Sequence, residues 1–311
     1  MSIKFSERNF CMQSCVSYEA CNLCRRNCKT DRSSGKVGYC GVGADMLIGR
    51  AALHEWEEPI ISGENGSGAI FFSGCSLGCV YCQNRRISKD KVGKKVSEEE
   101  LSEIMLRLRD AGAHNINLVT PTHYAIGIKR AVSIAKEKGL TLPIVYNTAS
   151  YDSIEALKYL ENTVDVYLPD FKYYRAKTAR EYSFAENYVD AAKEAIAEMV
   201  RQKPKPVIKD GLIKSGVIVR ILLLPGHVAE AKLSLSYLYK TYGDSIYVSL
   251  MSQYTPSESL PMPLNRRVTA AEYGELVEYA DKMGIKNCFI QEKESAKESY
   301  IPDFDGNKFI I

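Results

Sequence analysis

The sequence predicts an α/β protein, a partial (β/α)6-type TIM barrel preceded by a Cys-rich metal-binding segment. From residue 69 onward, short apolar runs alternate with helical stretches, which is the rhythm of βα units around a parallel sheet. Nine of the ten cysteines precede residue 83. The length of 311 residues suits one barrel of roughly 200–300 residues. We expect the Cys-rich segment and a connector over 1–66 and the barrel over 67–311.

Six apolar runs and a weaker seventh are the strand candidates. They cover residues 69–73, 116–120, 143–147, 164–168, 217–224 and 246–251, with 288–291 as the seventh. A helix is expected after Ser97, which can form a capping box with Glu100, and Gly112 ends it. A long helix is expected over 176–201, because Pro204 and Pro206 prevent it from continuing.

The first strand candidate leads into a loop with three cysteines at C-x3-C-x2-C spacing, Cys75, Cys79 and Cys82. A four-iron cluster is normally held by four thiolates, and three leave one iron open, as a catalytic metal requires. The alternatives are a zinc knuckle or free thiols, but zinc usually takes two Cys pairs well apart in sequence. The spacing, with Tyr81 before the third cysteine, resembles the radical S-adenosylmethionine (SAM) superfamily. That resemblance implies a [4Fe-4S] cluster that cleaves SAM to a 5'-deoxyadenosyl radical.

A second cysteine set lies near the front of the chain at C-x2-C-x3-C-x11-C spacing: Cys21, Cys24, Cys28 and Cys40. So small a segment would need a metal to hold its shape. Four cysteines can hold structural zinc or an auxiliary iron–sulfur cluster, and spacing does not separate the two. A metal-free, thiol-rich segment is the third alternative. Because a cluster is expected downstream, we favour a second iron–sulfur cluster over zinc.

Residues 46–68 contain the single Trp and are expected to form a loop or an edge segment that enters the first strand. Pro59 and several glycines favour this interpretation. The segment is either a connector packed by Trp56 or a source of catalytic groups, His54 or Glu57.

Polar side chains follow the expected strands, at the end of such barrels where chemistry gathers. SAM needs directional partners for its carboxylate, amino group, ribose and adenine in a largely apolar cleft. Arg220 can clamp the carboxylate with its guanidinium fork, or form a buried ion pair. Asn147 and Thr148 can bind the ribose hydroxyls, or cap the next helix.

Two further pairs of residues lie at strand ends. Asp170 and Lys172 face the same way on an extended segment, so they either pair with each other or bind cofactor and substrate. His123 and His227 lie at strand exits and either move protons near neutral pH or serve the structure.

Over almost its whole length the chain resembles radical SAM enzymes related to pyruvate formate-lyase activating enzyme, and within them a less characterised activase-like branch. The front cysteine set carries part of this resemblance. Five phrases carry the rest: Trp56-Glu57-Glu58-Pro59, Thr120-Pro121-Thr122-His123-Tyr124, Pro169-Asp170-Phe171-Lys172, Leu224-Pro225-Gly226-His227 and Met251-Ser252-Gln253-Tyr254. The resemblance implies that Cys75, Cys79 and Cys82 ligate the cluster and that the Tyr81 backbone meets the adenine.

The chain departs from this family in three places. Arg25 stands where the branch commonly has proline, which leaves the front cysteine set intact. Thr120-Pro121-Thr122 replaces the usual Gly-Gly-Glu motif, so the methionine amino group of SAM needs other partners, and Asn117 and Thr120 are the candidates. The extra cysteines precede the barrel, whereas glycyl-radical activases often carry a ferredoxin-like insert after the cluster loop.

We expect a radical SAM enzyme that abstracts hydrogen from a protein or peptide substrate, as a glycyl-radical-enzyme activase does. One alternative is the same chemistry on a small metabolite. Another is an iron–sulfur redox or metal-storage protein in which SAM has no role. The resemblance also implies a flavodoxin- or ferredoxin-type electron donor.

Composition excludes some other classes of function. A net charge of +3 gives no reason to expect a nucleic acid or membrane partner. No apolar run approaches the roughly 18 residues of a membrane span, and residues 1–10 lack the apolar core of a signal peptide. Ten cysteines in a chain without an export signal indicate metal rather than disulfides. We therefore expect a cytoplasmic protein.

Overall fold

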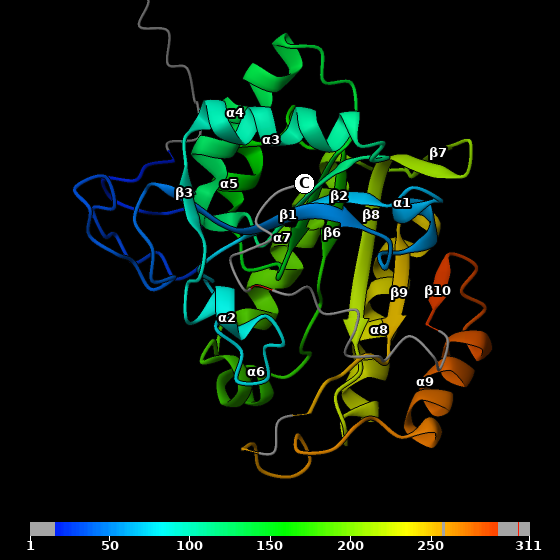
Figure 1. Cartoon of the computed structure of the whole chain (residues 1–311). Helices are drawn as coiled ribbons and strands as arrows, with labels where there is room; N and C mark the ends of the chain where they lie inside the picture. The colour runs from blue at the N-terminus through cyan, green and yellow to red at the C-terminus, as the bar shows by residue number, and fades with distance from the viewer. Residues whose placement is uncertain (1–15, 257–258, 292–303, 305–311) are drawn as a thin grey trace, which may run out of the picture.

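The fold is built on one ten-stranded sheet in a computed structural model that describes residues 16–256, 259–291 and 304 (Figure 1). The strand order is β10-β9-β8-β6-β5-β4-β2-β1-β3, and β7 pairs with β8 alone. The strands are β1 (Met46–His54), β2 (Ser67–Phe72), β3 (Lys94–Val96), β4 (Ile116–Val119), β5 (Ile144–Thr148), β6 (Val166–Pro169), β7 (Val207–Lys209), β8 (Leu212–Leu222), β9 (Tyr247–Met251) and β10 (Cys288–Ile290).

Helices connect most of the parallel strands. They are α1 (Pro59–Ser62), α2 (Arg85–Ser88), α3 (Glu98–Asp110), α4 (Ala125–Glu137), α5 (Ile154–Tyr159), α6 (Ala176–Ser183), α7 (Tyr188–Gln202), α8 (Val228–Tyr242) and α9 (Ala270–Lys282), with short 3-10 turns at Thr122–Tyr124 and Gly243–Ser245. None of these described helices is both long and apolar enough to cross a membrane.

The central part of the sheet is parallel and open, as the sequence predicts. Each neighbouring pair from β2 through β4, β5, β6, β8 and β9 to β10 is parallel. The order of the described strands ends at β10 on one side and β3 on the other, so the barrel is partial. Figure 1 shows β8 and β9 running side by side, with α3 and α4 together at the top.

All seven strand candidates are present, with ends shifted by a few residues. The capping box at Ser97 and Glu100 is also present. The single helix expected over 176–201 is wrong, because the chain forms α6 and α7. The break comes at Phe184, which adopts a left-handed conformation (φ 51°) that a helix cannot contain.

The strands β1, β3 and β7 were not expected as strands. β1 pairs antiparallel with β2, and β3 pairs antiparallel with β1. Both β1 and α1 lie within residues 1–66, but β1 is a strand of the main sheet and α1 packs against β8. The division of the chain at residues 66 and 67 therefore stays a proposal.

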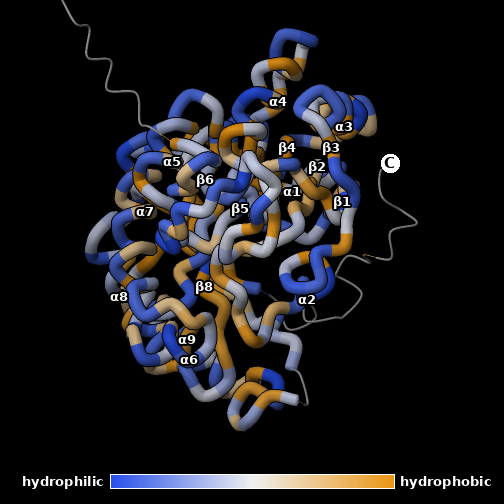
Figure 2. The backbone as a smooth tube through the Cα atoms, turned by 90° about the vertical axis from the view of Figure 1, so that its left-hand side faces the viewer, coloured by the Kyte–Doolittle hydropathy of each residue, from blue (hydrophilic) through white to orange (hydrophobic). Residues whose placement is uncertain are grey.

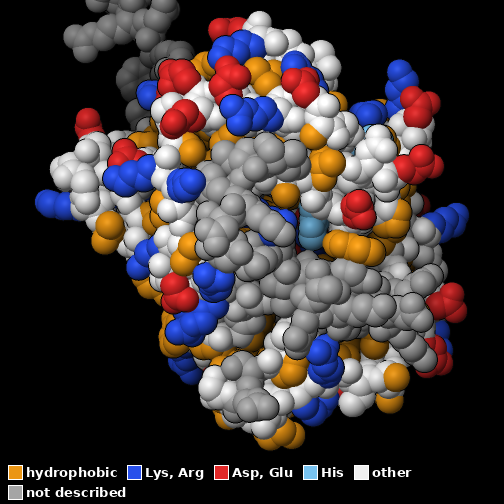
Figure 3. All heavy atoms as spheres, in the orientation of Figure 1, with side chains coloured by type: hydrophobic (Ala, Val, Ile, Leu, Met, Phe, Trp, Pro, Cys, Tyr) orange, Lys and Arg blue, Asp and Glu red, His pale blue; other side chains and the backbone are white. Residues whose placement is uncertain are grey.

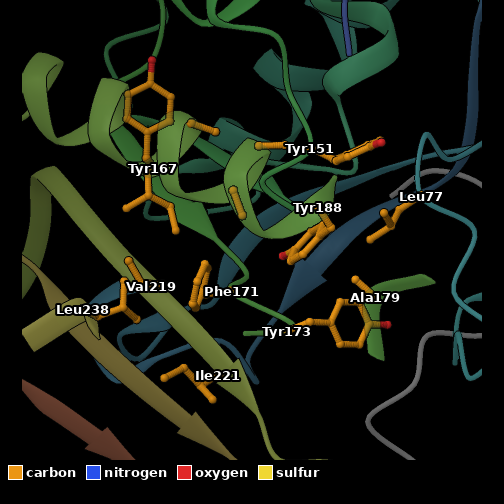
Figure 4. Close-up of a cluster of buried hydrophobic side chains, with 14 of the residues drawn as sticks. Leu77, Tyr151, Tyr167, Phe171, Tyr173, Ala179, Tyr188, Val219, Ile221 and Leu238 are labelled. Carbon is orange, nitrogen blue, oxygen red and sulfur yellow. The ribbon is translucent and has the colours of Figure 1, made fainter. Parts of the chain in front are cut away.

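The core lies between the sheet and the helices. Figure 2 shows hydrophobic stretches along strands such as β8 and hydrophilic stretches on the outer turns of the helices. The largest buried cluster includes Leu77, Tyr151, Phe171, Tyr173 and Tyr188 (Figure 4). Leu77 comes from the loop that carries Cys75, Cys79 and Cys82 and is fully buried. The core therefore anchors that loop from within.

One end of the barrel is filled by α1. Ile61 of this helix is fully buried and clusters with Val145, Val166 and Ile218, whose side chains come from β5, β6 and β8. The residues just before α1, Glu57 and Glu58, accept hydrogen bonds from Arg220 of β8.

Candidate active site at the carboxyl ends of the parallel strands

The cysteine loop follows β2 and packs against the front segment of the chain. Gly74 has a φ of 88°, and a Cβ atom there would lie 2.9 Å from the Cys40 carbonyl oxygen. Only glycine fits such a conformation and such a close approach. The Cys75 N–H also donates to the Cys40 carbonyl at 3.2 Å. The loop is thus held by Leu77 on the core side and by residue 40 on the other.

Each of the three loop sulfurs accepts one hydrogen bond. The Leu77 N–H donates to Cys75 Sγ at 3.4 Å, the Ser183 hydroxyl to Cys79 Sγ at 3.0 Å and the Ser88 hydroxyl to Cys82 Sγ at 3.3 Å. Hydrogen bonds to sulfur are what thiolate ligands of iron–sulfur clusters commonly receive. This donor set therefore fits the three protein ligands of a [4Fe-4S] cluster.

Electrostatics in the loop point the same way. Burial, with Cys79 and Cys82 nearby, raises the pKa of the Cys75 thiol to about 11. Three thiolates this close together would repel one another, so bound metal is what makes them stable together. No three His, Cys, Asp or Glu side chains in the described ranges are arranged to hold a single metal ion. A cluster spreads its ligands over several irons, so it does not need them to converge on one point.

A cavity of about 220 Å³ opens beside these sulfurs. Its walls combine the cysteine loop with the ends of the parallel strands. The site residues that line it are Cys75, Cys79, Tyr81, Cys82, Thr120, Asn147, Thr148, Asp170, Lys172 and Arg220. Figure 3 shows the molecule from the side of Figure 1, where basic and acidic side chains are interspersed over the upper helices.

Two residues that the sequence offered as catalytic groups, His54 and Glu57, also line the cavity. So does Asn84, which directly follows the cysteine loop and was not a candidate. The Asn84 Oδ1 atom is buried and has no hydrogen-bond partner among the described residues. The phrase Trp56-Glu57-Glu58-Pro59 was the available signal for Glu57, whereas nothing local distinguishes Asn84.

Arg220 forms the buried ion pair that was one of its two expected roles. Its Nε and Nη2 atoms donate to both carboxylate oxygens of Glu58, at 2.8 and 2.6 Å, and Nη2 also donates to Glu57. All three side chains are less than a tenth exposed. Nη1 donates to none of the described residues and remains able to bind a ligand carboxylate.

Asn117 does not line the cavity itself. Its Nδ2 donates to Glu57 Oε1 at 2.9 Å, and its buried Oδ1 has no partner in the described part of the chain. Glu57 is therefore held from two strands, by Asn117 of β4 and by Arg220 of β8. Its side chain also lines the cavity.

Thr120 directly follows β4 and has a φ of 60°, which is rare for a β-branched residue and marks a constrained position. The Thr148 hydroxyl donates to buried Asp152 at 2.6 Å, so it already has a structural partner. Neither Asn147 nor Thr148 caps the next helix, because Ser153 caps α5. The Thr148 hydroxyl is thus engaged, whereas the Asn147 side-chain amide forms no hydrogen bond with another described residue.

Asp170 and Lys172 form an ion pair of 2.6 Å on the cavity wall. Burial by itself lowers the pKa of Lys172, but the Asp170 carboxylate outweighs burial and raises it. Lys172 is therefore a fixed cation rather than a base at neutral pH. Tyr81 donates or accepts one hydrogen bond with Tyr173, at 2.7 Å, and its ring also faces Tyr254.

The two histidines at strand exits lie behind the cavity wall. Burial, with Arg32 nearby, lowers the pKa of His123 to about 3, and its Nε2 donates to the Ser73 carbonyl at 2.8 Å. His123 is therefore neutral at pH 7 and ties β4 to the cysteine loop. His227 contacts Tyr182 and Glu230.

The front cysteine set lies directly beside this site. Cys21, Cys24 and Cys40 are buried and Cys28 is exposed. Between Cys24 and Cys28, Arg26 extends its guanidinium to the Ser76 and Leu77 carbonyls at 3.0 and 3.2 Å. Cys24 also forms a β-bridge with Asp152, beyond β5. The two cysteine sets therefore share a boundary, which sequence separation alone did not reveal.

Comparison with known proteins adds the family. A relative from Methanocaldococcus jannaschii, an uncharacterized protein, is 28% identical over 279 residues, covering 86% of this chain and 76% of that protein. The crystal structure of methylornithine synthase shares 18% identity and a TM-score of 0.46, covering 70% of this chain and 68% of that one. SuiB of Streptococcus suis, bound to S-adenosylmethionine, shares 12% identity and a TM-score of 0.49, covering 72% of this chain and 50% of that one.

A family model also matches the chain. The model of the radical SAM superfamily matches residues 69–232, which begin with β2 and include the cysteine loop and the strand ends through β8. This stretch is more than half of the 311 residues. The chain therefore belongs to the radical SAM superfamily, whose chemistry depends on a [4Fe-4S] cluster and SAM.

Proposed function

We propose that Cys75, Cys79 and Cys82 hold the [4Fe-4S] cluster and that SAM binds beside it in the cavity, for hydrogen abstraction from a protein or peptide substrate. The observation that carries this proposal is the position of three hydrogen-bonded sulfurs at the rim of a cavity lined by strand ends. When bound, the cluster supplies the electron that cleaves SAM to methionine and a 5'-deoxyadenosyl radical. The protein's own task is to orient SAM and exclude water around the radical.

Several groups are placed to orient SAM. We assign the methionine carboxylate to Arg220 Nη1 and the ammonium group to the Glu57 carboxylate, which Asn117 and Arg220 hold in place. Charge-assisted hydrogen bonds of this kind are short and strong.

Asn147 and the backbone near Thr120 and Thr148 are assigned to the ribose, and the Tyr81 backbone to the adenine. The Asp170–Lys172 pair is assigned to the border between cofactor and substrate.

The finer function is activase-like, as the sequence phrases suggest. The described part of segment 253–268 supports a polymer substrate, because Gln253, Tyr254 and Thr255 line the cavity and Met262 nearby is 68% exposed. Residues 257–258 of this segment lie outside the described residues.

One observation favours a small metabolite instead. Phe304 packs its ring against Phe71 of the cavity wall, with ring centroids 5.6 Å apart, and a segment that covers the barrel would favour a small substrate.

The first test measures SAM cleavage. Anaerobically reconstituted protein should convert SAM to 5'-deoxyadenosine on reduction with dithionite, as quantified by mass spectrometry. A redox or metal-storage protein without SAM chemistry would form none, and that result would overturn the proposal.

The second test separates the two substrate classes. Cells are grown in deuterated medium, and their extract is divided by size into macromolecules and small molecules. Because hydrogen moves from substrate to 5'-deoxyadenosine, deuterium should appear in this product only with the fraction that contains the substrate. Transfer from the macromolecular fraction supports a protein or peptide. Transfer from the small-molecule fraction alone would show that the substrate is a small metabolite and not a protein or peptide.

We also propose that Cys21, Cys24, Cys28 and Cys40 hold a second metal centre, and that the chain divides functionally near residue 66. The centre is supported by the burial of three of the four thiols within one small segment. Iron and zinc analysis of the purified protein distinguishes a cluster from structural zinc.

A further inference from the structure

Arg32 is a buried cation without a carboxylate partner. Arg32 is only 1% exposed. Its guanidinium donates to three backbone carbonyls, of Val42 at 3.2 Å, His123 at 2.6 Å and Gly43 at 2.5 Å. No carboxylate among the described residues forms an ion pair with it. A buried charge that meets only neutral acceptors is costly, so an anion is expected close by.

Thiols are the neighbouring groups that can supply this charge. Arg32 Nη1 lies 3.6 Å from Cys21 Sγ, and the Cys40 thiol is close enough to act on it electrostatically. The rings of Tyr18 and Tyr124 flank the guanidinium at 4.8 and 5.6 Å and leave the charge uncompensated. Four thiolates around zinc or a [4Fe-4S] cluster carry a net negative charge. Arg32 lies beside these thiols, where a counter-ion of such a centre would be expected.

The space between the thiols is also kept open. A Cβ atom at Gly38 would lie 3.2 Å from Cys28 Sγ and 3.7 Å from Cys40 Sγ. Two of the four sulfurs therefore lie next to the same glycine. A side chain at residue 38 would occupy the space that a metal centre bound to these sulfurs needs.

This set of thiols is connected to the SAM-cluster loop by short contacts. Cys75 donates its N–H to the Cys40 carbonyl, and Arg26 binds the next two carbonyls of the loop. One hydrogen bond therefore joins the backbone of a ligand from each set. On the other side, Cys28 is exposed, so the front set reaches from the protein surface to the loop.

We infer that the front set holds a redox-active iron–sulfur cluster with Arg32 as its buried counter-ion, and that this cluster passes single electrons to the SAM cluster. The inference rests on the metal centre of the proposed function and deepens it. An external low-potential one-electron donor reduces the front cluster at the Cys28 side. The front cluster is reoxidised when it reduces the SAM cluster, and no bond or proton changes place in this transfer. Arg32 stabilises the reduced, more negative state.

The decisive experiment uses a full-length variant in which Cys75, Cys79 and Cys82 are all replaced by alanine. This variant lacks the three proposed ligands of the SAM cluster but keeps the front set, so the result does not depend on SAM cleavage. We expect the purified variant to contain iron and no zinc, and to show an electron paramagnetic resonance signal when the cluster is reduced. Zinc without iron, or no metal, would overturn the inference.

The role of Arg32 is tested in the same background with Arg32→Met and Arg32→Lys. Removing one positive charge this close should lower the ratio of reduced to oxidised cluster at a fixed potential at least about tenfold, which is about 59 mV for a one-electron couple. Arg32→Lys should restore most of the ratio, and Arg130→Met, a change on the exposed face of α4, should leave it unaltered. An unchanged ratio in Arg32→Met would overturn the assignment of the counter-ion.

Arg32→Met could fail to bind iron at all, so electron transfer is tested independently. Cys24→Ser, which removes one front ligand, should still show reduction of the SAM cluster by dithionite. With a flavodoxin as donor, reduction should be at least about tenfold slower than in the wild type, because the route through the front cluster is missing. Equal rates with flavodoxin would refute the relay.

Discussion

The Ser183 hydroxyl, at the last residue of α6, donates a hydrogen bond of 3.0 Å to Cys79 Sγ in the cysteine loop, 104 residues earlier in the chain. Ser183 in turn shares a hydrogen bond of 2.6 Å with Tyr173. This contact gives the break between α6 and α7 a function, because an uninterrupted helix would carry the chain past the cluster loop.

Replacing Ser183 with alanine should lower the reduction potential of the SAM cluster. Hydrogen bonds to cluster sulfurs stabilise the reduced state, and this one comes from a buried hydroxyl. A spectroscopic redox titration measures the shift. Ser34→Ala, on the exposed front segment, is the control and should titrate like the wild type. Identical potentials for Ser183→Ala and wild type would show that the contact does not act on the cluster.

Replacing Cys75 with alanine should abolish SAM cleavage, because the cluster loses one of three protein ligands. Cys288 offers a matched control, since it lies on β10 outside both cysteine sets. Cys288→Ala should retain cleavage within about twofold, as expected of a substitution away from the site. Formation of 5'-deoxyadenosine measures both. Cleavage by Cys75→Ala would remove this cysteine from the ligand set.

Replacing Cys21 with alanine should remove the metal of the front set while the SAM cluster remains. The two sets use separate thiols and are joined by backbone contacts and by Arg26. Iron analysis and Mössbauer spectra should show about half the wild-type iron if both sets hold four-iron clusters. Complete loss of iron would mean that the loop cannot form without the front centre.

Replacing Glu57 with glutamine should weaken SAM binding roughly 10–100-fold, because a hydrogen bond to a charged group contributes about 1.5–3 kcal/mol. Equilibrium binding of SAM to the oxidised, reconstituted protein measures this. Glu55→Gln is the matched control, since Glu55 is exposed and lies two residues away. Equal affinity in Glu57→Gln and Glu55→Gln would leave the ammonium group to another acceptor.

Glu58 should contribute to stability in a pH-dependent way. Burial raises the pKa of Glu58, but the Arg220 guanidinium outweighs burial and holds it below its usual range. A lowered pKa in the folded state means that the contribution is complete at neutral pH and is lost as the pH falls below the unfolded value of about 4.3.

Glu58→Gln should therefore cost roughly 3 kcal/mol at pH 7, as breaking buried pairs does, and progressively less at acidic pH. Urea unfolding at several pH values measures the difference. Glu103→Gln, which breaks an exposed pair with Lys138, should match the wild type. A deficit of Glu58→Gln that stays constant down to pH 3 would contradict the assigned charge.

Local patterns made the parallel strands and the cysteine loop predictable. Buried strands appear as apolar runs, and a metal-binding loop places its ligands at short intervals, so both signals lie within a few residues. The hairpin of β7 and β8 had a local signal too, because Asp210 and Gly211 form a turn with positive φ at both positions.

The composition of the cavity wall could not be predicted in the same way. Arg220 meets Glu57 and Glu58 across 163 and 162 positions of sequence, and nothing near Arg220 indicates these partners. The same holds for Cys40 and Cys75, whose contact depends on how the front segment returns to the sheet. Polar groups that meet through tertiary packing leave no periodic pattern to detect.

Gly74 shows how little separates the two cysteine sets. Its single hydrogen atom occupies the space between the loop and residue 40, where one added carbon would lie 2.9 Å from both the Cys40 oxygen and a Val42 methyl group. The methyl group of an alanine at this position would clash with residues 40 and 42 and push the two cysteine sets apart, while every thiol stays unchanged. For protein engineering, side chains of different size at residue 74 thus offer a way to vary the distance between the two cysteine sets while their ligands stay the same.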